Sequence, residues 1–208
     1  MSVANPPTMD ETLTRPTWEV ASLYPLQGEW SEGEYLILTD ATNRRFELVR
    51  GYLEELTMPT LSHQRMFDHL YILLRTVARR MGGRVYAAGA RVRLGPRHFR
   101  EPDIVFFRSK RDPRQSRDDY ADGADLVVEV VSGSAEDRER DLVKKRREYA
   151  HAGILEYWIV DPQTETLTVL SLQDQTYDEH GVFKRGEVAT SVLLAEVQVS
   201  VDEIFDAE

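Results

Sequence analysis

The sequence has 208 residues, no cysteine, 41% hydrophobic residues and a formal net charge of −10. This length and hydrophobic share allow one packed core, while the absence of cysteine excludes a disulfide partner and a thiolate metal site. The chain has no apolar run of about 18 residues and no signal-peptide pattern, so we expect a cytoplasmic protein with no membrane partner.

Charge is unevenly distributed along the chain. Residues 63–117 carry 14 Lys/Arg and 4 Asp/Glu, whereas residues 151–208 carry 2 Lys/Arg and 12 Asp/Glu. A basic segment of this kind can attract a polyanion to one face of a protein. It is equally typical of an ordinary solvated surface, and the sequence leaves both interpretations open.

The first half of the chain predicts an arm, a hairpin and a helix. Four prolines interrupt residues 1–30, so we expect an irregular arm there and a single domain over residues 31–208. Two short apolar runs flank Arg50-Gly51 and predict a hairpin. Apolar residues at helical spacing follow residues 60–62 and predict a helix that ends at the glycine pair 82–83.

Strands dominate the middle of the chain. Residues 84–88 and 91–94 predict two strands joined by a short turn. The apolar runs at residues 103–107 and 125–131 are nearly unbroken, as in strands buried on both faces. Residues 108–124, between these two runs, are polar and charged and predict an exposed loop.

The last third predicts a helix followed by strands. Ser134 is a candidate N-cap for a helix that runs to about His151. Residues 156–161 predict a strand that pairs with residues 166–170 in a hairpin. This order of elements predicts an α/β fold with a mixed central sheet flanked by helices, an added N-terminal hairpin and C-terminal strands.

Two acids lie in the segments that read as buried strands. Asp103 and Glu129 are 26 residues apart, and a buried carboxylate is costly unless it is paired or binds a metal. Neighbouring strands lie about 4.8 Å apart, so two inward carboxylates can share one ion. Oxygen donors without cysteine favour Mg²⁺ or Mn²⁺. The alternatives are an arginine partner for Glu129 and a turn-capping role for Asp103.

These residues carry a resemblance to a known family. Pro102-Asp103 followed by Glu129 at a strand end resembles the PD-(D/E)XK nuclease superfamily. Six blocks in order resemble the Uma-type family of restriction endonucleases within it, over roughly residues 40–170: residues 46–53, 62–64, 101–105, 125–134, 145–153 and 156–161. The resemblance implies a restriction-endonuclease-like fold and a Mg²⁺- or Mn²⁺-dependent endonuclease that hydrolyses phosphodiester bonds of DNA.

The resemblance also implies roles for individual residues. Asp103 and Glu129 would bind the metal, and Glu47 would complete or position the metal shell. Lys145 would orient or activate the attacking water. His63 matches a residue of the second block, and no role follows for it.

The lysine departs from the superfamily pattern. That pattern places a lysine two residues after the second acid, where this chain has Val131. The resemblance implies that the lysine has moved to the following helix, at Lys145. Lys144 would point about 100° away, so the two cannot serve one site.

The main alternative function is a catalytically inactive nuclease-fold protein that acts as a nucleic-acid-binding or protein-interaction module. A protein-interaction module would use the acidic C-terminal quarter of the chain. The presence of all four polar positions favours the nuclease. Because a duplex has two strands, a homodimer is a further expectation, with the hairpin at residues 157–170 as its surface.

Overall fold

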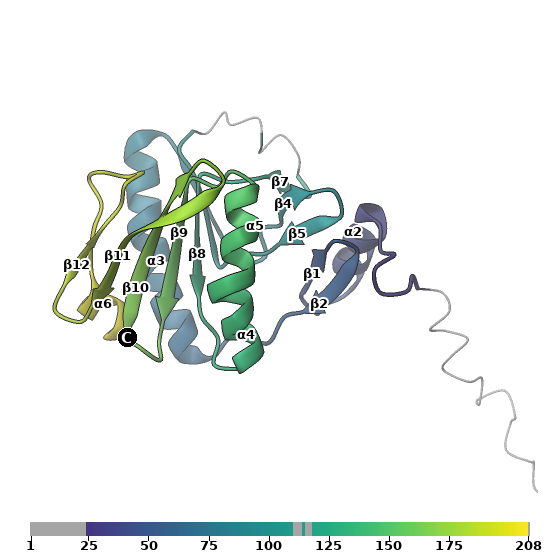
Figure 1. The fold of residues 1–208 in the computed structure, drawn as a ribbon, viewed down its shortest axis with the longest axis horizontal. Coiled ribbons are helices and arrows are strands. Elements are labelled where there is room, and N and C mark those ends of the chain that lie inside the picture. The colour runs from purple at the N-terminus through teal and green to yellow at the C-terminus, as the bar shows by residue number, and fades with distance from the viewer. Residues whose placement is uncertain (1–23, 110–113, 115–117, 208) are drawn as a thin grey trace, which may run out of the picture.

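The computed structural model describes residues 24–109, 114 and 118–207 (Figure 1). Most of the arm predicted over residues 1–30 lies outside this part of the chain. Its last residues dock on the N-terminal hairpin, since the main-chain nitrogens of Gly28 and Trp30 both donate to the carbonyl oxygen of Gly51. Within the described residues, no helix combines the length and apolarity that a membrane span requires.

A six-stranded mixed sheet forms the centre of the described fold, in the order β11-β10-β9-β8-β6-β3. β8 and β9 are parallel, and the other neighbours are antiparallel. The strands are β3 (Arg84–Ala87), β6 (Ile104–Phe107), β8 (Leu126–Val130), β9 (Glu156–Asp161), β10 (Thr166–Gln173) and β11 (Thr176–Lys184).

A smaller sheet lies beside it, in the order β2-β1-β5-β4-β7. Its strands are β1 (Phe46–Val49), β2 (Tyr52–Glu55), β4 (Val92–Gly95), β5 (His98–Arg100) and β7 (Ala121–Asp122). β1 and β2 form the predicted N-terminal hairpin. A two-stranded ladder of β12 (Val188–Thr190) and β13 (Gln198–Ser200) completes the described strands.

Helices cover both faces of the central sheet (Figure 1). α3 packs on one face, and the α4–α5 segment packs on the other. The described helices are α2 (Glu32–Ala41), α3 (Leu61–Met81), α4 (Ala135–Glu139), the π-helical turn η3 (Arg140–Lys144), α5 (Lys145–His151) and α6 (Val201–Phe205). The predicted mixed sheet flanked by helices is therefore confirmed.

The long helix α3 begins and ends where the sequence predicts. The side chain of Thr60 accepts from the main-chain nitrogen of His63 as an N-cap. Gly82 ends the helix in the left-handed conformation, with φ of 74°, which glycine adopts without strain. Met66 and Leu70 lie on its buried stripe against the central sheet.

The two faces of β8 explain its unbroken apolar sequence. Leu126 and Val128 belong to the cluster that α3 covers, whereas Val127 belongs to the cluster under α5. Alternate residues of a strand face opposite sides, so Glu129 faces α5 together with Val127. The second acid is thus directed at the helix that carries the candidate lysine.

Three details differ from the sequence predictions. The two strands predicted at 84–88 and 91–94 belong to different sheets, as β3 and β4. The predicted helix from Ser134 to His151 contains a π-helical turn. In the hairpin at residues 157–170 only the turn at residues 162–165 is fully exposed, because β9 and β10 are interior strands of the central sheet and their apolar side chains are buried. The strands of that hairpin are therefore not the exposed surface that was expected for a dimer.

The junction between α3 and β3 generates a stability prediction. A Cβ atom on Gly83 would collide with the carbonyl oxygen of Phe107, so we expect Gly83→Ala to lower the free energy of unfolding by about 1–3 kcal/mol. Gly33 in α2 is the matched control, because a Cβ there meets no atom within 4 Å. Gly33→Ala should raise stability by about 0.5–1 kcal/mol. Urea denaturation measures both, and equal stability of Gly83→Ala and wild type would contradict this packing.

Candidate active site

The register of β6 and β8 brings the two strand acids together. Ile104 lies opposite Val128 in this antiparallel pair, and continuing the register by one residue places Asp103 opposite Glu129. The main-chain nitrogen of Val130 donates to Asp103 Oδ2 at 2.8 Å. The 26-residue spacing between Asp103 and Glu129 therefore covers β6, the connection from β6 to β8, and most of β8.

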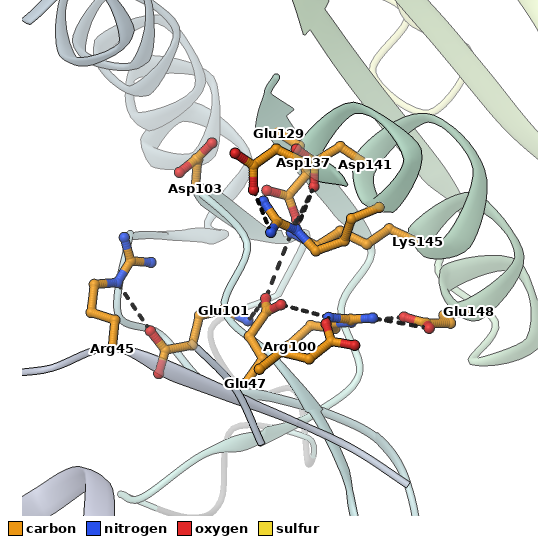
Figure 2. Close-up of polar contacts among 12 residues, drawn as sticks. Arg45, Glu47, Arg100, Glu101, Asp103, Glu129, Asp137, Asp141, Lys145 and Glu148 are labelled. Carbon is orange, nitrogen blue, oxygen red and sulfur yellow. Dashed lines mark hydrogen bonds and ion pairs between the residues drawn. The ribbon is translucent and has the colours of Figure 1, made fainter. Parts of the chain in front are cut away.

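Lys145 lies at the centre of a cluster of acids (Figure 2). Its side chain is buried, and Nζ lies 2.8 Å from Glu129 Oε1, 3.2 Å from Asp141 Oδ1 and 3.6 Å from Glu47 Oε1. Lys144 is exposed. Of the two neighbouring lysines, only Lys145 reaches the strand acids, as the helical geometry predicts.

The π-helical turn η3 accompanies this arrangement. Turns of this kind widen a helix locally and are frequent at functional sites. Asp141 lies within the turn and Lys145 directly follows it. Their side chains pair with each other close to Glu129 (Figure 2). The sequence prediction missed Asp141, although its position four residues before Lys145 is the ordinary spacing of a helical ion pair.

Tyr149 also contacts the acid of β8. It is fully buried, and its hydroxyl donates to Glu129 Oε1 at 2.5 Å. Lys145 and Tyr149 are four residues apart on α5 and so reach the same carboxylate oxygen. One oxygen of Glu129 is thereby fixed by two donors.

The surroundings of Glu129 oppose the ionisation of its carboxyl group. Burial raises the pKa of Glu129 to about 7, Lys145 opposes this rise, and Asp103 adds to it. Burial disfavours the charged form of Lys145, yet Glu129, Glu47 and Asp141 outweigh this effect and raise its pKa. Lys145 is therefore positively charged, and Glu129 lies between this ammonium and the other acids of the cluster.

Glu47 is placed behind Lys145. Its Oε2 accepts from an Arg100 guanidinium nitrogen at 2.6 Å, and its Oε1 accepts from the main-chain nitrogen of Glu101 at 2.9 Å. Burial would raise the pKa of Glu47, but Lys145 and Arg100 lower it to about 2. Both oxygens of this carboxylate are thus occupied by protein donors.

Arg100 connects the smaller sheet to α5, and the sequence prediction missed it. This fully buried guanidinium binds Glu47 at 2.6 Å, Glu54 at 2.7 Å and Glu148 at 2.7 Å. Nε2 of His98 lies 3.3 Å from the same Glu148 carboxylate. Burial opposes the ionisation of Glu148, but His98 and Arg100 lower its pKa to about 2. The signal in the sequence was the position of Arg100 directly before the Glu-Pro-Asp block.

His63 contacts the other strand acid. It lies in the first turn of α3, and its Nε2 is 3.2 Å from Asp103 Oδ2. Burial lowers the pKa of His63, but the hydrogen bond to Asp103 and the charges of Asp103 and Glu129 raise it overall. His63, to which the family resemblance assigns no role, therefore holds one oxygen of Asp103 in place.

A cavity of about 30 Å³ lies between these side chains, and its wall includes Asp103, Glu129 and Lys145. A water molecule needs about 10–15 Å³ on this measure, so the cavity has room for one or two waters or an ion. Glu47 does not contribute to its wall. Among the described residues, Asp103 Oδ1 and Glu129 Oε2 accept no hydrogen bond, so each acid has one oxygen left for a ligand.

This donor set fits a hard divalent cation with few protein ligands. In the described part of the chain, no three His, Asp or Glu side chains are arranged to hold a metal ion together. Mg²⁺ does not require three, because it usually keeps several waters and binds one or two carboxylates plus phosphate oxygens. Two carboxylates beside a water-sized cavity match that preference.

A mixed sheet with helices on both faces and two acids at adjacent strand ends defines a restriction-endonuclease-like fold. A crystal structure titled as a putative nuclease belonging to DUF820, from Anabaena variabilis ATCC 29413, shares it with a TM-score of 0.67 and 21% sequence identity. The match covers 87% of this chain and 98% of that chain.

The family model described as Uma2, "Putative restriction endonuclease", matches residues 33–202. The chain therefore belongs to this family, and both the predicted family and the predicted fold class are confirmed. A search of curated protein sequences finds no match.

The buried arginine generates a stability prediction. Arg100→Met should lower the free energy of unfolding by about 3–5 kcal/mol, because it removes the closest cationic partner of the buried Glu47 and of Glu148. Arg79→Met is the control, since Arg79 is exposed on α3, and it should change stability by less than about 0.5 kcal/mol. Urea denaturation at pH 7 measures both variants. Similar losses for the two would show that Arg100 does not support the fold.

Glu148 generates a prediction of pH dependence. Its pKa is lowered to about 2 from an ordinary 4.5, so its ionised form stabilises the fold above pH 4.5 and this contribution is lost as pH falls toward 2. We expect Glu148→Gln to be less stable than wild type at pH 7, by up to about 3 kcal/mol. The difference should shrink steadily between pH 4.5 and pH 2. A difference that stays constant with pH would contradict the ion pair.

Proposed function

We propose that the protein is a metal-dependent endonuclease that hydrolyses phosphodiester bonds of DNA, with Mg²⁺ or Mn²⁺ as cofactor. The observation that carries this proposal is the convergence of Asp103, Glu129 and the buried Lys145 on one small cavity. Family membership and the fold of a crystallised relative agree with a nuclease. The raised pKa of Glu129, caused by burial and by the neighbouring Asp103, supports the cation, because a divalent ion there would stabilise the ionised carboxylate.

Each side chain has a role that its contacts support. Asp103 and Glu129 would hold the metal through their remaining oxygens, and His63 keeps Asp103 in orientation. When bound, the metal would polarise the phosphoryl oxygen and lower the pKa of its water. Lys145 orients the attacking water and offsets negative charge that develops on the phosphate.

Glu47 was expected to complete the metal shell. Its oxygens bind Arg100 and the main chain of Glu101, and it contacts Lys145. We propose that it acts mainly on Lys145, keeping the ammonium charged and directed at Glu129. A direct bond to the metal would require Glu47 to leave Arg100.

The exposed charge supports a polyanionic substrate. Several arginines of the basic segment are used internally: Arg91 pairs with Asp40, and Arg93 pairs with Glu32. Four others are exposed along α3, at Arg65, Arg75, Arg79 and Arg80. We propose that this helix supplies the basic surface that attracts DNA, since phosphate contacts dominate non-specific affinity.

The alternative is a catalytically inactive module that keeps the nuclease fold. An inactive protein has no need to bury several acids and a lysine beside one cavity, because their desolvation opposes folding. The intact cluster around Lys145 therefore favours the enzyme. A homodimer remains an expectation for cleaving both strands of a duplex.

The test is cleavage of plasmid and single-stranded DNA with Mg²⁺, Mn²⁺ or EDTA. We expect cleavage with either metal and none with EDTA, and a loss of at least about 100-fold for Asp103→Asn, Glu129→Gln and Lys145→Met. Lys144→Met is the matched control, because Lys144 is exposed on the neighbouring position. It should retain wild-type activity within about threefold.

Two results would contradict the proposal. Wild-type cleavage no faster than that of Asp103→Asn on every substrate would exclude these acids as the catalytic site. A larger loss for Lys144→Met than for Lys145→Met would show that the buried lysine is not the catalytic one.

A further inference from the structure

A second cavity adjoins the candidate active site. It has a volume of about 360 Å³ and shares Thr57, His63 and Ser132 with the smaller cavity. This volume falls within the range of about 300–1,000 Å³ that is typical of small-molecule sites. A chemical group bound in this second cavity would therefore lie next to a ligand held by Asp103, Glu129 and Lys145.

The walls of this second cavity are apolar with neutral polar groups. Met66 and Val131 are buried, whereas Met58 is 82% exposed and Pro162 is also exposed. The neutral polar lining residues are Thr57, Thr60, Ser62, Ser132 and Gln163. Within the described residues, the side-chain amide of Gln163 makes no hydrogen bond. Such walls suit a flat, uncharged group with a hydrogen-bonding edge.

Apart from His63, the charged side chains that line this cavity are Arg138 and Asp137, and both are already paired. Arg138 binds Asp161 through two nitrogens, at 2.8 and 2.7 Å. Asp137 accepts from the Ser134 hydroxyl at 2.7 Å and pairs with Arg140 at 2.6 Å. Among the described residues, Arg138 is the one arginine or lysine that lines this cavity, whereas Arg45, Arg140 and Lys145 line the smaller one.

We propose that the second cavity binds an unstacked nucleobase adjacent to the phosphate that is cleaved, so that the enzyme prefers unpaired DNA to intact duplex. This inference rests on the proposed function. A base inside a duplex must leave its stack to enter such a pocket, which costs a few kcal/mol, and the cost is least for single-stranded or unpaired bases. A charged cavity for phosphate beside a neutral cavity for the base matches the two parts of one nucleotide.

The first arm of the test compares substrates with wild-type protein and Mg²⁺. The substrates are one oligonucleotide as a single strand, as a duplex, and as a duplex with one unpaired nucleotide. We expect kcat/KM to be at least tenfold higher for the single strand than for the duplex, with cleavage of the third substrate close to the unpaired nucleotide. Equal kcat/KM for all three would overturn the inference.

The second arm fills the cavity. Gly133 lines it, and a Cβ on Gly133 meets no atom within 4 Å, so Gly133→Met places a side chain in open space. Gln163→Trp blocks the exposed rim without touching the buried core. Both should lower kcat/KM for the single strand at least tenfold and reduce the preference over duplex, with Mg²⁺ affinity by calorimetry unchanged.

Gly33→Met on α2 is the matched control, because a Cβ on that exposed glycine also meets no atom within 4 Å. It should leave kcat/KM and the substrate preference unchanged. Wild-type preference in both Gly133→Met and Gln163→Trp would show that the base lies elsewhere. Failure of the nuclease proposal is distinguishable, since the Asp103→Asn protein would then cut every substrate as fast as wild type.

Discussion

The ion cluster around Lys145 is the interaction on which the rest of the structure depends. A buried ammonium is tolerated only with close anionic partners, and three carboxylates from β1, β8 and the π-helical turn supply them. Removing the lysine would leave Glu129 without a cationic partner, whereas Glu47 would keep Arg100 and Asp141 would keep Arg140. The same group thus fixes α5 against the central sheet and fixes Glu129 at the cavity, so stability and the proposed chemistry share one set of contacts.

Arg100 extends this dependence to the smaller sheet. It lies on β5 and binds Glu47 of β1, Glu54 of β2 and Glu148 of α5. Since Glu47 in turn contacts Lys145, the orientation of the lysine depends on the smaller sheet. The strands β1, β2 and β5 of this sheet supply no side chain to the wall of the small cavity. This explains why the first block of the family resemblance, around Glu47, belongs with the site even though Glu47 does not line it. A buried network of this kind is costly when one member is missing.

Sequence patterns could predict the parts of the site that follow from local rules. Asp103 and Glu129 were identifiable because each lies in an apolar strand segment. Lys145 was identified only from the family resemblance, and helical geometry added that Lys144 cannot serve the same site. Asp141 and Arg100 were missed, since their local signals, the four-residue spacing to Lys145 and the position before the Glu-Pro-Asp block, do not show that distant segments bury them. The hairpin at residues 157–170 was taken as exposed because its pairing with β8 and β11 is also non-local. The hydrogen bond from the Tyr149 hydroxyl to Glu129 was also not predicted, since it depends on how α5 packs over β8.

The central claim is that Asp103 and Glu129 bind a divalent cation beside Lys145. The most direct measurement is anomalous X-ray diffraction from crystals soaked in Mn²⁺, which locates the ion without reference to activity. We expect one strong peak in the small cavity, bonded to Asp103 Oδ1 and Glu129 Oε2, with Lys145 still paired to the other oxygen of Glu129. A fully ordered cavity without a Mn²⁺ peak at saturating concentration, or Mn²⁺ bound only elsewhere, would contradict the claim.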